Sequence, residues 1–246
     1  MLLLSVVLIQ GWWREPAILF SGNPAAWTLT CEAFFYALHP WMSRLLRLVS
    51  SRGALVAAAA IVLLSFAWRI LAVAAPGLLP GEVPFPIARL GEFALGMCLA
   101  HAMRGGWLPR ARAGAVIAAS SLVVAVIAVA VATSWLGPLG TAIRLLTNEG
   151  MLVVCAALIA TVAARDLRGG RSLLRHPVLV RLGEASYAFY LVHATIVYAM
   201  LALVGRQEGA IALAWYPLML GLALAGAFAL HLGVEKPLER RMRRWW

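Results

Sequence analysis

Charged side chains are scarce in this chain of 246 residues. Only 13% of the residues are Asp, Glu, Lys or Arg, whereas 63% are hydrophobic and the mean hydropathy is +0.88. A soluble domain has about 25% charged and about 45–50% apolar residues, and a domain of this size still exposes a large surface to its solvent. The composition therefore excludes a water-soluble fold and predicts an integral membrane protein, for which the lipid bilayer is the solvent.

Acidic residues are the scarcer of the charged kinds. The chain has 10 Asp and Glu against 21 Lys and Arg, which gives a formal net charge of +11. A strongly basic chain can bind nucleic acid, but here the basic residues cluster at the ends of apolar runs. This placement is typical of the excess of Lys and Arg in cytoplasmic loops, so we expect no nucleic-acid partner.

Cysteine is also rare. Cys31, Cys98 and Cys155 each lie within an apolar stretch and lack the spacing of metal ligands. Buried cysteine of this kind usually acts as a small hydrophobic side chain. We therefore expect neither a structural disulfide nor a metal site.

Seven segments are long and apolar enough to cross a bilayer core, which takes about 20 helical residues. Residues 1–10 are apolar but too short to cross, and they lack the basic start and cleavage site of a signal peptide. We expect them to be the end of a helix whose beginning is missing. The sequence thus predicts an all-α fold, a polytopic transmembrane helix bundle of about seven full spans plus a partial N-terminal helix, in a single domain over 1–246. The full spans are expected at 28–49, 54–75, 86–104, 112–135, 143–164, 183–204 and 210–235.

The basic residues also predict an orientation. If the C-terminus is cytoplasmic, the inner loops hold 16 Lys and Arg, the outer loops and their margins hold four, and Arg69 remains within a span. An excess of this kind on one side of the membrane marks the cytoplasmic side. We therefore expect a protein of a bacterial-type plasma (inner) membrane with a cytoplasmic C-terminus. The inner loops counted are 44–52, 104–112, 165–181 and 236–246.

Polar residues recur on one face of the expected span 28–49. Thr28, Glu32, Tyr36 and His39 are spaced at i, i+4, i+8 and i+11, which places them on one side of a helix. One interpretation is a single buried Glu bonded to a neighbouring helix. The other is the wall of a functional site, because an ionisable residue inside a membrane is costly and usually functional. We favour the second.

Arg89 and Arg69 also allow both a structural and a functional interpretation. Arg89 and Glu92 are three residues apart and can pair on one face of a helix, either as a structural ion pair or as part of a site. Arg69 lies towards the outer side of its span, where it can snorkel to the interface or pair with Glu32 or Glu92. Both interpretations stay open.

The expected span 183–204 has a polar face of its own. Ser186, Tyr190 and His193 are spaced at i, i+4 and i+7, with Tyr187 beside them. Histidine suits proton transfer near neutral pH, although a lone His in a span can equally be a packing residue.

Two further acidic residues have simple structural explanations. Glu149 follows Asn148 at the start of a span, where a carboxylate favours the helix dipole. Glu235 precedes Lys236 at the end of the last span, where a salt bridge is expected to close the helix.

Four segments in a fixed order resemble the acyltransferase 3 family. Residues 27–40 are similar to the family's "W-S-L-x-x-E-x-x-F-Y-x-x-x-P", with Thr28 in place of the usual Ser. Residues 89–96 resemble "R-x-x-E-F-x-x-G", residues 182–193 resemble "L-G-x-x-S-Y-x-x-Y-L-x-H", and residues 235–237 match the closing "E-x-P".

The resemblance implies a membrane enzyme that acylates extracytoplasmic carbohydrates, as in O-acetylation of polysaccharides. The acyl group, commonly acetyl, would come from acyl-CoA as a co-substrate, with no tightly bound cofactor. A hydroxyl acceptor needs a base, and the tetrahedral intermediate needs hydrogen-bond donors. Glu32 is the candidate to orient the acceptor or take its proton, and His193 the secondary catalytic group. The candidate substrate-binding residues are Trp27, Thr28, Tyr36, Arg69, Arg89, Glu92, Ser186, Tyr187 and Tyr190.

The chain departs from the family pattern at its start. The family has ten spans, and the first carries an Arg followed by the His taken as catalytic. That part is absent here, so we expect a truncated chain rather than one in which His193 replaces that His. Two alternatives follow: a catalytically incomplete fragment, or a transporter or flippase that uses the buried charges as a substrate path. A transporter predicts internal repeats and broken helices near the midplane, and the sequence has neither signal.

Overall fold

The computed structural model describes residues 2–75, 77–79, 83–133, 136–170, 173–206 and 209–244. Helix is the only regular structure in these ranges, so the all-α prediction is confirmed. The chain divides into two compact units, each described by itself. The central unit is residues 31–172, and the terminal unit joins residues 1–30 to 173–246.

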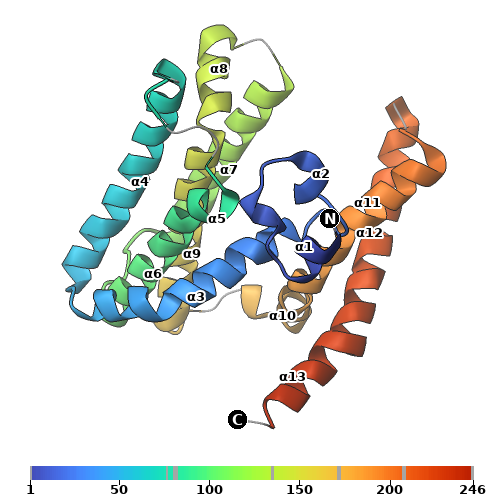
Figure 1. Cartoon of the computed structure of the whole chain (residues 1–246). Helices are drawn as coiled ribbons and strands as arrows, with labels where there is room; N and C mark the ends of the chain where they lie inside the picture. The colour runs from blue at the N-terminus through green and yellow to red at the C-terminus, as the bar shows by residue number, and fades with distance from the viewer. Residues whose placement is uncertain are drawn as a thin grey trace. The chain divides into compact units, whose positions relative to one another are not determined.

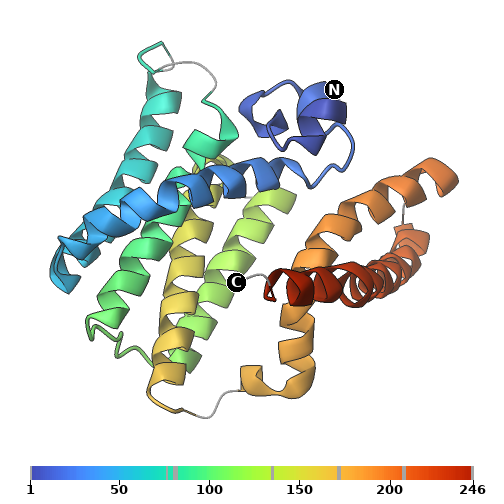
Figure 2. The same ribbon diagram turned by 60° about the horizontal axis from the view of Figure 1, so that its bottom comes forward.

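The central unit is a group of long helices joined by short turns. Helices α4, α6, α7 and α9 run side by side along much of their length (Figures 1 and 2). Ser50 caps the start of α4, because its hydroxyl accepts a hydrogen bond from Gly53 N at 3.2 Å. The helices are α3 (Trp27–Arg47, here from Cys31), α4 (Ser51–Ala74), α5 (Phe85–Ala88), α6 (Leu90–Arg104), α7 (Ala113–Ala132), α8 (Gly137–Leu145) and α9 (Thr147–Leu167).

A cluster of buried apolar side chains, two of them small, joins three helices of this unit. Ala58 of α4 packs with Leu95 and Cys98 of α6, and each is at most 5% exposed. Leu152 and Ala156 of α9 pack against this cluster. Small residues let helix backbones approach closely, which is how helices associate where lipid removes the hydrophobic driving force. The cluster therefore fixes α6 between α4 and α9.

The terminal unit is centred on the helix pair α11 and α12 (Figure 1). Asn23 Nδ2 donates to the Leu191 carbonyl at 2.9 Å and so ties the N-terminal segment to α11. The elements are α1 (Leu2–Val6), η1 (Gln10–Trp12), α2 (Pro16–Leu19), the first turn of α3, η2 (Leu173–Arg175), α10 (Pro177–Glu184), α11 (Ser186–Val204), α12 (Gly209–Leu230), the π-helical turn η3 (His231–Glu235) and α13 (Lys236–Met242).

Five of the described helical segments are long and apolar enough to cross a membrane: Ser51–Ala74, Ala113–Ala132, Thr147–Leu167, Ser186–Val204 and Leu213–Met242. The count of seven full spans is therefore not confirmed. The expected span 86–104 is broken because α5 ends at Ala88 and α6 begins at Leu90, which leaves 15 residues in α6. The expected span 28–49 is a continuous helix, α3, but it carries Glu32, His39 and two arginines and is less apolar than the others.

The first ten residues also differ from the expectation. Helix covers only Leu2–Val6, and Leu8 has a left-handed backbone with φ of 55°. Gln10 then folds inward and is fully buried, and the next residue, Gly11, donates its N–H to Thr30 Oγ1 at 3.2 Å. A Cβ at Gly11 would lie 2.9 Å from Thr30 Cβ, so this close approach requires glycine.

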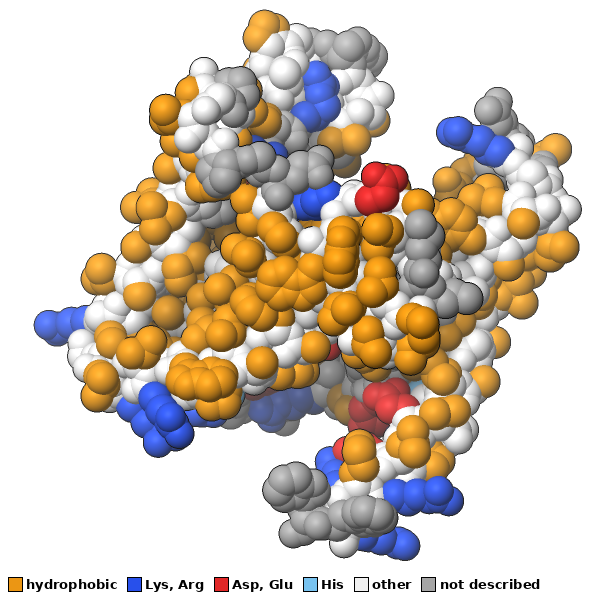
Figure 3. Space-filling model, in the orientation of Figure 1, with side chains coloured by type: hydrophobic (Ala, Val, Ile, Leu, Met, Phe, Trp, Pro, Cys, Tyr) orange, Lys and Arg blue, Asp and Glu red, His pale blue; other side chains and the backbone are white. Residues whose placement is uncertain are grey.

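Large apolar side chains remain exposed on both units. Leu63, Leu122, Ile159 and Leu213 are each between 66% and 72% exposed. Hydrophobic side chains cover most of the face shown in Figure 3, and Lys and Arg gather near the helix ends. Soluble proteins rarely expose contiguous apolar surface of this extent. The surface is that of an integral membrane protein, as the composition predicts.

Close packing of α11 on α12 gives a test of the terminal unit. A Cβ at Gly226 would lie 2.9 Å from Val192 Cγ1, whereas a Cβ at Gly221 on the same helix would meet nothing within 4 Å. We expect Gly226→Leu to destabilise the protein by about 1–3 kcal/mol through overpacking. Gly221→Leu is the matched control, because it gains the same helix propensity without the clash. Thermal unfolding in detergent measures the difference; equal melting temperatures for the two variants would contradict this packing.

Candidate active site

Helix α3 is fixed against α6 by aromatic side chains. The rings of Phe35 and Phe93 stack with centroids 5.0 Å apart and planes 15° apart. The ring of His39 meets the same Phe93 edge-on at 6.3 Å. Cys31 and Glu32 lie about one turn before Phe35, and Glu92 directly precedes Phe93. The stacked pair thus packs the start of α6 against the first half of α3.

The start of α6 carries a local ion pair. Arg89 ends α5 and stands at the N-cap of α6, where its guanidinium donates to the Glu92 carboxylate three residues on. This confirms the predicted pairing.

Glu32 lies on α3, about one turn before Phe35. Its side chain is half-buried, and within the described part of the chain it forms no hydrogen bond or ion pair. A carboxylate without a partner is free to bind or take a proton from a ligand. The structure places three predicted site residues in the central unit: Glu32 on α3, and Arg89 and Glu92 at the start of α6.

Arg69 pairs with a residue that the sequence did not suggest. Its Nε lies 3.7 Å from Glu149 Oε1, so of the two alternatives left open by the sequence, pairing with Glu32 or Glu92 is not the one that the structure shows. Glu149 is only 8% exposed, and its Oε2 has no partner among the described residues. Helix packing places the Glu149 carboxylate inside the unit, against α4, so the helix dipole alone does not explain it. Only the packing of α4 on α9 reveals this pair.

A groove begins at the Arg89–Glu92 pair and runs between α6 and α9. Its volume is about 440 Å³. Asn148 lies at the same end as the ion pair, and the other lining residues are apolar or small: Leu95, Gly96, Leu99, Ala100, Met103, Met151, Leu152, Cys155, Ala156, Ile159, Ala160 and Ala163. A polar end that opens into an apolar groove is the usual form of a small-molecule site.

The remaining predicted site residues lie elsewhere. Tyr36 is on the central unit and 66% exposed. Trp27, Thr28, Ser186, Tyr187, Tyr190 and His193 belong to the terminal unit. Two of their hydroxyls are engaged at helix starts: Thr28 Oγ1 donates to the Ala25 carbonyl at 3.0 Å, and Ser186 Oγ donates to the Gly183 carbonyl at 2.7 Å.

His193 is held in one orientation. Its Nδ1 donates to the Tyr190 carbonyl at 2.6 Å, and its ring stacks on Phe189 with centroids 5.8 Å apart. A proton fixed on Nδ1 leaves Nε2 as the basic nitrogen of the neutral ring. His193 is therefore a competent proton acceptor within its own unit.

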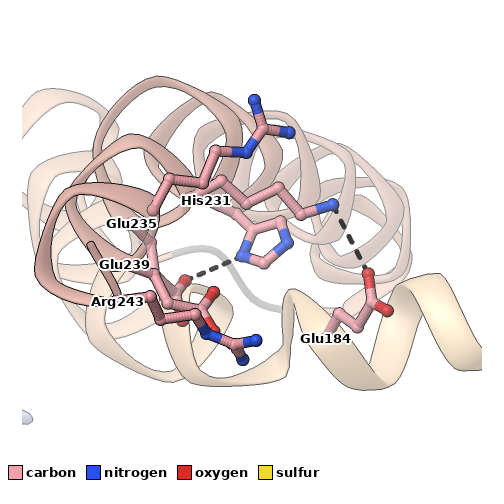
Figure 4. Close-up of a pocket in the computed structure, with 7 residues that line it drawn as sticks. Glu184, His231, Glu235, Glu239 and Arg243 are labelled. Carbon is pink, nitrogen blue, oxygen red and sulfur yellow. Dashed lines mark hydrogen bonds and ion pairs between the residues drawn. The ribbon is translucent and has the colours of Figure 1, made fainter. Parts of the chain in front are cut away.

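The terminal unit also has a polar pocket that the sequence analysis did not predict. His231 is 6% exposed, and its Nδ1 lies 2.8 Å from Glu235 Oε2 across the π-helical turn (Figure 4). Lys236 instead reaches across to Glu184, with Nζ 3.5 Å from Oε2. The interaction expected of Glu235 at the end of the last span is therefore made with His231, not with the neighbouring Lys236. The pocket has a volume of about 450 Å³ and is lined by Glu184, His231, Glu235, Lys236, Glu239, Arg240 and Arg243.

Comparison with known proteins decides the family. The model of the acyltransferase domain matches residues 2–232. The chain belongs to this acyltransferase family. It is 34% identical over 263 aligned positions to a protein named acyltransferase MdmB from Streptomyces mycarofaciens. That alignment covers 98% of this chain and 64% of the relative, so the chain spans less than two thirds of its length. No solved structure matches the chain significantly.

The family match covers both units of this acyltransferase-family chain. It confirms the family resemblance and includes the segments at 27–40, 89–96 and 182–193. Residues 31–40 and 89–96 belong to the central unit, where Phe35 stacks on Phe93. The segments at 182–193 and 235–237 meet in the terminal unit, where Glu184 reaches Lys236.

The His231–Glu235 pair gives a test of the terminal pocket. We expect Glu235→Ala to lower the free energy of unfolding by about 1–3 kcal/mol, because His231 Nδ1 loses its partner while buried. Glu239→Ala is the matched control, since its partner Arg243 is 79% exposed and surface pairs contribute about 0–1 kcal/mol. Thermal unfolding in detergent compares the two; a Glu239→Ala variant as unstable as Glu235→Ala would contradict the geometry.

Proposed function

We propose that this chain acts as a membrane-bound acyltransferase that moves an acyl group from acyl-CoA to a hydroxyl of an extracytoplasmic carbohydrate. Membership of the acyltransferase family supports the reaction class. The observation that carries the proposal is the Arg89–Glu92 pair at the mouth of the groove, next to Phe93, on which Phe35 of the Glu32-bearing helix α3 stacks.

The chemistry follows from the three side chains. The Glu32 carboxylate takes the proton of the sugar hydroxyl as its oxygen attacks the thioester carbonyl carbon. The Arg89 guanidinium donates hydrogen bonds to the oxyanion that develops on the carbonyl oxygen, and Glu92 orients Arg89. When the C–S bond breaks, the CoA thiolate takes the proton back from Glu32. The product is an ester of the sugar, with acetyl as the simplest acyl group.

The other predicted residues have supporting places in this proposal. Tyr36 shares the face of α3 with Glu32 and is open to a ligand. Arg69 acts through its pairing with Glu149 rather than on the substrate. His193 is a secondary proton acceptor, and Tyr187, Tyr190 and Trp27 are sugar-binding candidates, because aromatic side chains offer both a flat face and a polar tip.

The orientation and span count also belong to the proposal. We take α3 and the α5–α6 pair as two further membrane crossings, which gives seven in all. The C-terminus then lies in the cytoplasm and the protein lies in a bacterial-type plasma (inner) membrane. The excess of Lys and Arg in the inner loops supports this direction.

Replacement of Glu32 tests the proposal. We expect purified protein to transfer acetyl from acetyl-CoA to a polysaccharide hydroxyl, and Glu32→Gln to lower kcat about 10²–10⁴-fold because the proton acceptor is lost. Glu239→Gln, on an exposed ion pair outside the cluster, is the control and should keep wild-type activity. Transfer of radiolabelled acetyl is the measurement. Full activity in Glu32→Gln, or solute uptake without any acyl transfer, would refute the proposal.

A further inference from the structure

The groove between α6 and α9 is larger than an acetyl group requires. An acetyl group has three heavy atoms and takes the room of about three waters, roughly 90 Å³, whereas the groove has about 440 Å³. From Arg89 to Met103 it follows α6 for 14 residues, which is a rise of about 21 Å. A reaction limited to acetyl would leave most of this length unused.

The lining restricts what can fill this space. Polar groups lie only at the end formed by Arg89, Glu92 and Asn148. A sugar or the amide-bearing arm of CoA would lose its hydrogen bonds to water along the apolar remainder, at a cost of about 1–3 kcal/mol for each unpaired group. An unbranched hydrocarbon chain makes no hydrogen bonds to water, so it loses none on entering the groove. The groove therefore fits an aliphatic chain whose polar end stays at the ion pair.

We propose that this groove binds the aliphatic chain of a medium- or long-chain acyl donor, with the thioester carbonyl at Arg89 and the chain running along α6 towards Met103. The inference rests on the proposed function and deepens it, because it names the acyl group as a chain longer than acetyl. The groove is continuous with the proposed catalytic cluster, and this continuity favours a reacting acyl chain over a bilayer lipid.

Gly96 is the position that tests the groove by filling it. It lies one turn beyond Glu92 on α6, it lines the groove, and a Cβ placed there would meet nothing within 4 Å. A Leu side chain at this position therefore enters the groove without disturbing the helix packing. Gly114 on α7 has equally open surroundings but does not line the groove, so Gly114→Leu is the matched control.

The first experiment compares acetyl-CoA and decanoyl-CoA as donors for the full chain in lipid nanodiscs. Wild-type protein and Gly114→Leu are expected to use decanoyl-CoA. Gly96→Leu should lower the ratio of decanoyl to acetyl transfer at least about tenfold, the scale of discrimination for methylene-sized changes in an apolar pocket. Transfer by wild type from acetyl-CoA alone, or an equal ratio in all three proteins, would overturn the groove assignment while leaving the proposed function intact.

The second experiment measures binding without turnover. Cys155 lines the groove and is exposed, whereas Cys31 and Cys98 are buried, so N-ethylmaleimide should alkylate Cys155 selectively. Cys155→Ala gives the background. Decanoyl-CoA is expected to slow the alkylation severalfold, and acetyl-CoA or CoA is not. Equal alkylation rates with and without decanoyl-CoA would assign the groove to membrane lipid and overturn the inference. Protection by decanoyl-CoA without transfer from any donor would reject the proposed function and retain the groove.

Discussion

The Arg89–Glu92 ion pair stands where α5 ends, α6 begins and the groove opens. An unpaired charge among apolar helices is costly, because lipid offers it neither water nor a counter-ion. Three arginines in the central unit meet this constraint with a defined partner. Arg89 pairs with Glu92, Arg69 pairs with Glu149, and Arg144 donates to the Ala130 carbonyl at 2.6 Å. Among the described carboxylates of the central unit, Glu32 has neither a hydrogen bond nor an ion pair, so its side chain is open to a ligand.

The packing of small residues gives these pairs their places. The cluster of Ala58, Leu95 and Cys98 sets α6 between α4 and α9, and the stacking of Phe35 on Phe93 adds α3. The packed helices then hold their polar side chains at fixed positions. A site on rigid elements is preorganised for reaction, and here the same helix, α6, carries both the ion pair and one wall of the groove.

Local spacing explains which parts of the site the sequence could predict. Arg89 and Glu92 are three residues apart on one helix, so their pairing follows from helix geometry alone. Glu235 and His231 are four residues apart, so their pairing could have been predicted in the same way. The sequence analysis instead considered Glu235 together with the neighbouring Lys236. Arg69 and Glu149 are 80 positions apart, and nothing local indicates that α4 packs on α9. Hydropathy predicted the helices well, but not the break at Arg89 that shortens α6 to 15 residues.

The central claim is that Glu32 and Arg89 act on the same reacting carbonyl and hydroxyl. A double-mutant cycle on kcat/KM for acyl transfer, with Glu32→Gln and Arg89→Gln singly and together, tests it most directly. Residues that act as a unit are strongly non-additive. The account predicts that the double variant loses little more activity than the more damaged single variant. Losses that multiply, or a single variant of either residue with wild-type kcat/KM, would contradict it.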